Sequence, residues 1–363
     1  MDIREQGSEN QKSGRNDLQE EKTQQNEAEI QEAGEAFSQK DMSAGEKNAI
    51  QQSEQQSEPA GKGSRDPDNS SRQTADDGRE TLSAASCTAA SGKGFTEYAD
   101  PGSKKVAVIT GASSGLGREY CRYLDEKNEK FGLDELWIIA RRRERLQELA
   151  DSLKIPCRIF SLDLSEESSI QVLEKELEKE NPDVKFLITA AGFGKMGNYQ
   201  SISRQEYDKM LLINCKGMMD VTLVCLPYMH RNARILEVAS VAAFQPMTQF
   251  NVYAASKAFV SSYSRALRWE LFPRHINLTC VCPYWIKDTE FIQTTREDTD
   301  RPTAIRHFPF ASTARHVVVQ SMAHNRAWLP FSVPGVFAPI YRIWTKFAPH
   351  ELALLVWEGW RRI

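Results

Sequence analysis

The first 94 residues have few of the side chains from which a hydrophobic core is built. Before Phe95 there is one aromatic residue, Phe37, and there is neither tryptophan nor valine. The first hundred residues carry 21 Asp and Glu against 11 Lys and Arg, so the acidity of the chain lies here. So polar a segment cannot bury enough apolar surface to offset the loss of chain entropy. We expect residues 1–100 to form a disordered acidic tail that serves either solubility or tethering.

The chain also lacks the spacings of metal sites and disulfide frameworks. Its seven cysteines show no C-x-x-C pair, and its six histidines show no ligand spacing. This pattern favours free thiols in a reducing compartment and no metal site. No basic start followed by an apolar run opens the sequence, so we expect no secretory or transit signal and a cytoplasmic protein. No nucleic-acid partner is expected.

Beyond residue 101, short β-branched runs alternate with longer helical patterns. Continuous apolar strands separated by helices indicate a parallel sheet that is buried on both faces. The prediction is a doubly wound, mainly parallel α/β domain of the Rossmann type over residues 101–325, with helices on both faces. The expected strands are 105–110, 135–139, 158–162, 184–189, 234–240 and 276–282, and the expected helices are 116–128, 142–153, 165–180, 204–229 and 251–271.

A glycine-rich turn follows the first expected strand. The stretch "TGASSGLG" places Gly111, Gly115 and Gly117 between a strand and a helix. Glycine spacing by itself is a weak signal, since any tight turn favours glycine. At a helix start, however, bare backbone N–H groups and the positive end of the helix dipole bind a pyrophosphate. The turn therefore predicts a dinucleotide site.

The end of the second expected strand indicates which dinucleotide is preferred. An acidic residue here would bind a free ribose 2′-hydroxyl, but Ala140 is followed by Arg141, Arg142 and Arg143. A guanidinium pairs with a 2′-phosphate, which a carboxylate would repel. NADP(H) is therefore favoured over NAD(H), with Arg141 as the phosphate ligand. Arg143, and to a lesser degree Arg142, also fit a solvated basic helix start.

Tyr253 and Lys257 are four residues apart in the run "NVYAASKAFV", so a helix places both on one face. A free tyrosine has a pKa of about 10, and a nearby ammonium favours the phenolate, which makes the hydroxyl usable as an acid and a base. The fifth expected strand delivers Ser240 at its carboxyl end, where open α/β sheets bind ligands. Ser240 can then hydrogen-bond the oxygen that Tyr253 protonates.

With these motifs the chain resembles the short-chain dehydrogenase/reductase family, from about Lys104 to Phe291. The segments "TGASSGLG", "LDL", "AAG", "LLINCKG", "VAS", "YAASK" and "CP" follow one another in the order of the family. The resemblance implies that Asn214 holds a water linking Lys257 to solvent, that Ser240 orients the substrate and that Tyr253 transfers the proton. It implies that Lys257 binds the nicotinamide ribose and lowers the tyrosine pKa, and that Asp163 contacts the adenine. The implied cofactor-binding set is Gly111, Ser113, Ser114, Gly115, Leu116, Gly117, Arg141, Asp163, Ala191, Gly192, Tyr253, Lys257, Pro283 and Thr289.

Three departures from the family pattern lie near the cofactor. The usual "NNAG" reads "TAAG" at residues 189–192, which removes two asparagine side chains. The usual "PG" reads Pro283–Tyr284, and the following "TEF" comes one residue late. These departures affect the nicotinamide contacts more than the four catalytic residues.

The segments after Phe291 bear on the substrate. A polar insert carrying Phe308 and Phe310 is either a lid over the substrate or a surface loop. The hydrophobic extension 326–363 is broken by three prolines between Ala327 and Tyr341, so it is not expected to span a bilayer. It is expected to add a final strand and helices to the pocket wall or to a subunit contact. The alternative is peripheral membrane contact through Trp344, Lys346, Trp357, Trp360, Arg361 and Arg362.

An apolar lid and an aromatic tail favour a bulky hydrophobic substrate. The expected function is NADP(H)-dependent interconversion of a secondary alcohol and a ketone, with a hydroxysteroid as candidate substrate by family analogy. The alternatives are a 3-oxoacyl-thioester reductase or another carbonyl reductase, and a non-catalytic NADP(H)-binding regulator or scaffold. The resemblance also implies a homo-oligomer, either a dimer or a tetramer.

Overall fold

The computed structural model describes residues 96, 98–291 and 311–362, the side chains up to residue 359. The expected acidic tail and the insert with Phe308 and Phe310 therefore lie outside the described residues, apart from a few residues at the end of the tail. The described residues belong to one compact unit, which contains the whole sheet.

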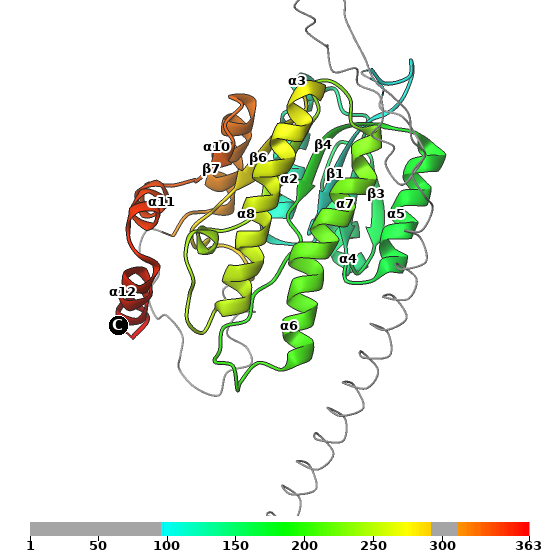
Figure 1. Ribbon diagram of the computed structural model, residues 1–363. Coiled ribbons are helices and arrows are strands. Elements are labelled where there is room, and N and C mark those ends of the chain that lie inside the picture. Colours follow the sequence, from blue (N-terminus) through cyan, green and yellow to red (C-terminus); the bar gives the residue numbers. More distant parts are fainter. Residues whose placement is uncertain (1–95, 97, 292–310, 363) are drawn as a thin grey trace, which may run out of the picture. The chain divides into compact units, whose positions relative to one another are not determined.

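Seven parallel strands form the centre of this unit, in the order β3-β2-β1-β4-β5-β6-β7 (Figure 1). The first crossover runs outward from β1 to β3 and the chain then returns to β4, so the strand order reverses beside β1 and β4. This confirms the doubly wound, Rossmann-type prediction. The strands are β1 (Lys105–Thr110), β2 (Glu135–Ala140), β3 (Cys157–Ser161), β4 (Asp183–Thr189), β5 (Arg234–Val238), β6 (Asn277–Val281) and β7 (Phe331–Ser332).

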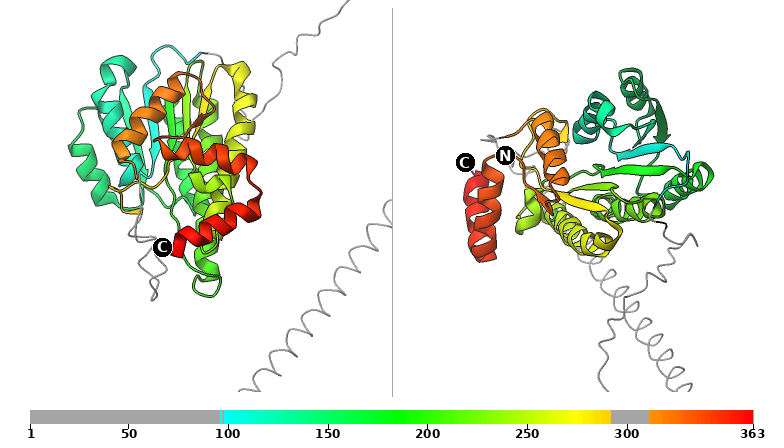
Figure 2. Two further views of the ribbon diagram at one scale, coloured as in Figure 1. Left: turned by 90° about the vertical axis from the view of Figure 1, so that its left-hand side faces the viewer. Right: turned by 90° about the horizontal axis from the view of Figure 1, so that it is seen from above.

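Helices cover both faces of the sheet, as Figures 1 and 2 show. Helices α2, α4 and α10 pack on one face, and α5, α7 and α8 pack on the other. The helices are α2 (Gly115–Glu126), α3 (Asn128–Phe131), α4 (Arg143–Asp151), α5 (Glu167–Glu180), α6 (Arg204–Leu211), α7 (Met218–Cys225), α8 (Asn251–Leu271), α10 (Ala314–Arg326), α11 (Phe337–Phe347) and α12 (His350–Arg362).

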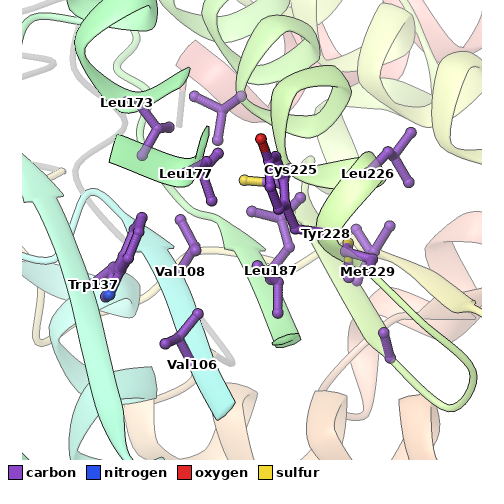
Figure 3. Close-up of a cluster of buried hydrophobic side chains, with 14 of the residues drawn as sticks. Val106, Val108, Trp137, Leu173, Leu177, Leu187, Cys225, Leu226, Tyr228 and Met229 are labelled. Atoms are coloured by element: carbon purple, nitrogen blue, oxygen red, sulfur yellow. The ribbon is translucent and has the colours of Figure 1, made fainter. Parts of the chain in front are cut away.

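The two cores arise from the alternation of side chains along each strand. In β1, Val106 and Val108 face the α5–α7–α8 layer, and Ala107 and Ile109 face the opposite layer. Figure 3 shows the first of these clusters, in which Leu187 of β4 is also buried. Burial of both faces explains why the strands read as continuous apolar runs.

The expected helix 204–229 is one continuous segment with a changed turn in its middle. Residues Leu212–Gly217, between α6 and α7, form a π-helical turn. The segment Arg204–Tyr228 is apolar and long enough to span a membrane by composition, but half of its most apolar window is buried within the protein. Such burial is typical of a core helix, and Val221 and Cys225 indeed pack into the core.

The C-terminal extension joins the same sheet. Strand β7 pairs in parallel with β6 and is the seventh strand, so the extension begins by completing the sheet edge. Helices α11 and α12 follow beyond this edge (Figure 2). The extension therefore contributes a strand and two helices to the described unit.

Candidate active site

A cavity of about 550 Å³ lies at the carboxyl edge of the sheet. It extends from Arg141 and Asp163, after β2 and β3, past the turn after β1, to Ser240 and Tyr253. Every residue of the implied cofactor-binding set lines it except Gly117. Ends of parallel strands meet at this edge, which brings together residues far apart in the sequence.

The glycine-rich turn is shaped by close backbone contacts. Gly111 has a φ of +70°, and a Cβ there would lie 2.8 Å from the backbone of Ala190 and Ala191. A Cβ on Gly117 would collide with the carbonyl of Gly111. Gly117 is therefore required for the close packing of the turn, although it does not line the cavity. Ser114, the N-cap of α2, makes no side-chain cap hydrogen bond. The start of α2 is thus open toward the cavity and fits a pyrophosphate.

Arg141 and Asp163 form one end of the cavity. The Arg141 Nη1 lies 3.7 Å from the Asp163 Oδ2, and about three fifths of the arginine side chain is exposed. Burial acts to raise the pKa of Asp163, but hydrogen bonds from Ser165 and the charge of Arg141 outweigh it, so the pKa lies below its ordinary value. Asp163 is therefore ionised at neutral pH and partly balances the guanidinium.

Arg142 lines the cavity, although the sequence was also consistent with a solvated position at the helix start. Its Nη2 donates to the Ser114 Oγ at 3.2 Å and to the Glu290 Oε2 at 3.1 Å. Arg145 of α4 also pairs with Glu290. This ion pair joins α4 to the loop after β6 beside the cavity that Arg142, Ser114 and Glu290 line. In the sequence, the run of three arginines indicated Arg142 as a candidate cofactor residue, but no motif near Glu290 indicated that it would lie in the site.

Ser240 and Tyr253 meet at the other end of the cavity. Ser240 is the N-cap of the short helix Val241–Phe244, and its Oγ accepts a hydrogen bond from the Ala242 N–H. Ser240 and Tyr253 both line this end of the cavity, and Tyr253 is 6% exposed. Burial raises the pKa of Tyr253 above its ordinary value, and the neighbouring Ser240 hydroxyl acts in the opposite direction. The tyrosine is therefore a neutral phenol that can donate a proton.

Lys257 shares the helix face with Tyr253 and lines the same cavity. Its Nζ lies 5.8 Å from the centre of the tyrosine ring and donates to the Val238 carbonyl at 2.9 Å. Its expected role in lowering the tyrosine pKa stays a prediction. Burial also lowers the pKa of Lys257 to about 8, so this ammonium can lose a proton near neutral pH.

Asn214 lies behind the cavity wall, on the π-helical turn. Its Nδ2 donates to the Phe193 carbonyl at 2.9 Å and to the Ser256 Oγ at 3.0 Å, and its Oδ1 accepts from the Phe193 N–H. A Cβ on Gly192 would lie 2.9 Å from that Oδ1 and 3.4 Å from the Lys257 Nζ. Asn214 therefore braces the segment after β4 against α8, and its water-holding role stays a prediction.

The segments that depart from the family pattern still line the cavity. In the "TAAG" segment, the Ala191 N–H donates to the Thr110 Oγ1 at 3.0 Å, which ties the end of β4 to the end of β1. The Pro283 carbonyl accepts from the Val241 N–H at 3.1 Å. The Thr289 methyl carbon lies 3.6 Å from the position of a Cβ on Gly115, so the late "TEF" still reaches the glycine-rich turn.

Aromatic side chains from three distant parts of the chain surround Tyr253. Phe250 stacks on the tyrosine ring with centroids 4.2 Å apart, and Phe291 lies 5.5 Å from it. Trp285 stacks with Phe250 at 6.3 Å. Trp357 of α12 is 7% exposed and lines the same cavity. The sequence indicated an aromatic extension, but only the fold shows which of its rings lie near the tyrosine.

Comparison with known proteins shows the family. The profile of the short chain dehydrogenase family matches residues 105–300, and the chain belongs to this family. A relative from Escherichia coli, the NADP-dependent 3-hydroxy acid dehydrogenase YdfG, is 31% identical over 191 residues, which are 51% of this chain and 74% of that protein. The protein is therefore an oxidoreductase that acts on CH–OH groups with a nicotinamide cofactor.

Solved structures of the family share the fold at lower identity. A short-chain dehydrogenase from Sphingobium yanoikuyae in complex with NADPH has a TM-score of 0.53 and 22% identity, and covers 63% of this chain and 87% of its own. One from Burkholderia phymatum in complex with NAD has a TM-score of 0.57 and 22% identity, and covers 71% of this chain and 96% of its own. Neighbours of this fold thus include complexes with either dinucleotide.

Proposed function

We propose that the protein interconverts a secondary alcohol and a ketone on a bulky hydrophobic molecule, such as a hydroxysteroid, with NADP(H) as cofactor. The observation that carries the proposal is the environment of Tyr253: Ser240 lies with it at one end of the cavity, and Phe250, Trp285 and Trp357 line the cavity beside it. Such a lining favours burial of a large apolar substrate with one polar atom directed at the two hydroxyls.

In this proposal the chain's residues handle the substrate oxygen and the proton. The bound dinucleotide supplies or accepts the hydride. Ser240 hydrogen-bonds the carbonyl oxygen, and Tyr253 donates its proton to that oxygen in the direction of reduction. The raised pKa of Tyr253 keeps the phenol protonated before the step. To Lys257, whose pKa burial lowers to about 8, we assign the return of a proton to the tyrosine and the binding of the ribose.

Three observations support NADP(H) over NAD(H). Arg141 lines the cavity at the end of β2, and about three fifths of its side chain is exposed. Arg142 lines the same part of the cavity. The relative YdfG is named as NADP-dependent.

Arg141→Asp should therefore weaken NADPH binding more than NADH binding, by about 2 kcal/mol, because a charge-assisted hydrogen bond is lost. Equal losses for both dinucleotides would contradict the assignment.

The alternative substrates are 3-oxoacyl thioesters and smaller carbonyl compounds. One screen separates them: NADPH oxidation by the purified protein with steroid ketones, acyl thioesters and simple aldehydes. We expect the highest kcat/KM for the steroid ketones, because they fill the aromatic cavity. A preference for small aldehydes would overturn the bulky-substrate part of the proposal and leave the reaction type intact.

The reaction type has its own test. Tyr253→Phe retains the ring that stacks on Phe250 but removes the transferable proton, so turnover should be lost while NADPH still binds. Ser240→Ala should lower kcat and keep the same NADPH affinity. Fluorescence titration of NADPH beside steady-state rates measures both quantities. Turnover of Tyr253→Phe near the parent rate would refute the proposed proton donor.

We also propose that the protein is cytoplasmic, and, from the family resemblance, that it is a homo-oligomer. Exposed apolar side chains on the α6–α7 segment and on α8, namely Leu211, Leu212, Leu223 and Phe259, are available for a subunit contact. Sedimentation velocity of the purified protein tests the assembly.

A further inference from the structure

The cavity wall contains a second pair of hydroxyl groups, in addition to those of Ser240 and Tyr253. Tyr284 follows Pro283 in the loop after β6, and Tyr341 belongs to α11 of the C-terminal extension; both line the cavity. Where the family pattern "PG" has a glycine, this chain has the phenol ring of Tyr284. The departure from the pattern therefore adds a large side chain with a polar end to the wall.

One phenylalanine ring connects these two residues, which we call the tyrosine pair. The Phe337 ring, which also lines the cavity, lies 5.0 Å from the ring of Tyr284 and 5.9 Å from that of Tyr341, measured between centroids. Tyr253 instead stacks on Phe250, with centroids 4.2 Å apart. The tyrosine pair thus forms a polar point of its own in a mainly aromatic part of the wall.

Both hydroxyls of the tyrosine pair keep their proton at neutral pH. Burial raises the pKa of Tyr284 to about 12, and it also raises the pKa of Tyr341, to which the nearby Tyr284 adds. Within the described part of the chain neither hydroxyl is hydrogen-bonded, and neither is fully enclosed as the hydroxyl of Tyr263 is. Each phenol is therefore a hydrogen-bond donor and acceptor that a ligand in the cavity can reach.

A bulky substrate would remove water from the tyrosine pair. A buried hydroxyl without a partner is destabilising, and buried tyrosines therefore usually make a hydrogen bond. A pure hydrocarbon body would leave both hydroxyls unpaired, whereas an oxygen on that body would bond them. Lys195 also lines the cavity, but its ammonium is paired with Glu206 of α6. The tyrosine pair is thus the better placed partner for a neutral oxygen.

We propose that Tyr284 and Tyr341 bind a second oxygen of the substrate, so that the enzyme selects ketones and alcohols whose apolar body also carries a hydroxyl or carbonyl group away from the reacting carbon. This inference rests on the proposed function and adds a second polar group to the substrate. Ser240 and Tyr253 bind the reacting oxygen, while the tyrosine pair binds the other one. Hydrogen bonds at two points orient the molecule toward the cofactor.

The test compares ketones that differ by one distant hydroxyl. One pair is 5α-androstan-17-one and 3-hydroxy-5α-androstan-17-one, and the other is 5α-androstan-3-one and 17-hydroxy-5α-androstan-3-one, so that either end can react. Steady-state kcat/KM with NADPH is measured for the parent and for Tyr284→Phe/Tyr341→Phe, which loses both hydroxyls and retains both rings. The matched control is Tyr123→Phe on α2, a residue that does not line the cavity. Titration with NADPH checks that each protein is folded.

In the pair that the parent reduces, its kcat/KM should be about tenfold higher for the hydroxyketone than for the plain ketone, since one hydrogen bond contributes roughly this factor. The Tyr123→Phe control should retain this ratio, and the double variant should lower it to about one. A parent without preference, or an unchanged ratio in the double variant, would overturn the inference and leave the proposed function intact. A parent that reduces none of the four ketones would contradict the proposed steroid-like substrate itself, and the inference would fall with it.

Discussion

Glu237 of β5 permits a quantitative prediction about the frame that carries the proposed catalytic residues. It has no exposed surface, and its carboxyl group accepts hydrogen bonds from Thr222 of α7 and Ser264 of α8. The same strand leads to Ser240, and the same helix α8 carries Tyr253. The buried carboxyl group thus joins the elements that carry these two hydroxyl groups.

Burial raises the pKa of Glu237 from 4.5 to about 7, and the two hydrogen bonds act against this rise. The folded state therefore retains the proton to a higher pH than the unfolded state does. Stability falls as the pH rises between these two values, since unfolding then releases a proton. At about 1.36 kcal/mol for each pH unit, the total loss is about 3 kcal/mol, of which about 2.5 kcal/mol falls between pH 5 and pH 8.

Glu237→Gln removes this titration and keeps the shape of the side chain. The amide oxygen can accept from Thr222, and the amide N–H can donate to the Ser264 Oγ while that hydroxyl donates to the Val260 carbonyl. Denaturant unfolding of parent and variant from pH 5 to pH 8 measures the effect, because titrations shared by both proteins cancel in the difference. The variant should gain about 2.5 kcal/mol on the parent over this range. A difference that does not change with pH would refute a buried carboxyl that titrates near 7.

Three further outcomes are expected. Gly111→Ala should destabilise the domain by about 2 kcal/mol or more and weaken dinucleotide binding, because the new Cβ meets the backbone of Ala190 at a positive φ; a cofactor affinity like the parent's would contradict this. Glu290→Gln should lower the Kd for NADPH several-fold and leave that for NADH nearly unchanged, because the carboxylate that pairs with Arg142 would also repel a 2′-phosphate; equal shifts for both dinucleotides would refute a role of Glu290 in cofactor choice. Trp357→Ala should lower kcat/KM for bulky ketones by about tenfold and hardly change it for small aldehydes, since the lost ring lines only part of the cavity. Equal losses for both substrate classes would instead show that the hydrogen bond from Trp357 to Thr248, which anchors α12, supports the whole site.

The sequence by itself determined the parallel sheet and the glycine-rich turn, and it indicated the candidate catalytic residues. Strands β1 to β6 and the helices for which bounds were expected begin and end within about two residues of the expected positions, because continuous apolar strands and helical periodicity are local signals. The bounds of β7 and of α10 to α12 were not predicted. Tyr253 and Lys257 could be predicted as a pair since helical spacing alone places them on one face. Ser240 could be added because strand ends of a parallel sheet meet at one edge.

Only the tertiary structure decided the electrostatics and the walls of the site. Trp357 lies in the cavity with Tyr253, and Glu290 pairs with Arg142, although each pair is separated by more than a hundred residues. The raised pKa of Tyr253 follows from the burial of its side chain. Burial and long-range contacts are properties of the packed chain. A short window of sequence shows which groups are present, but their free energies of ionisation depend on what the fold places around them.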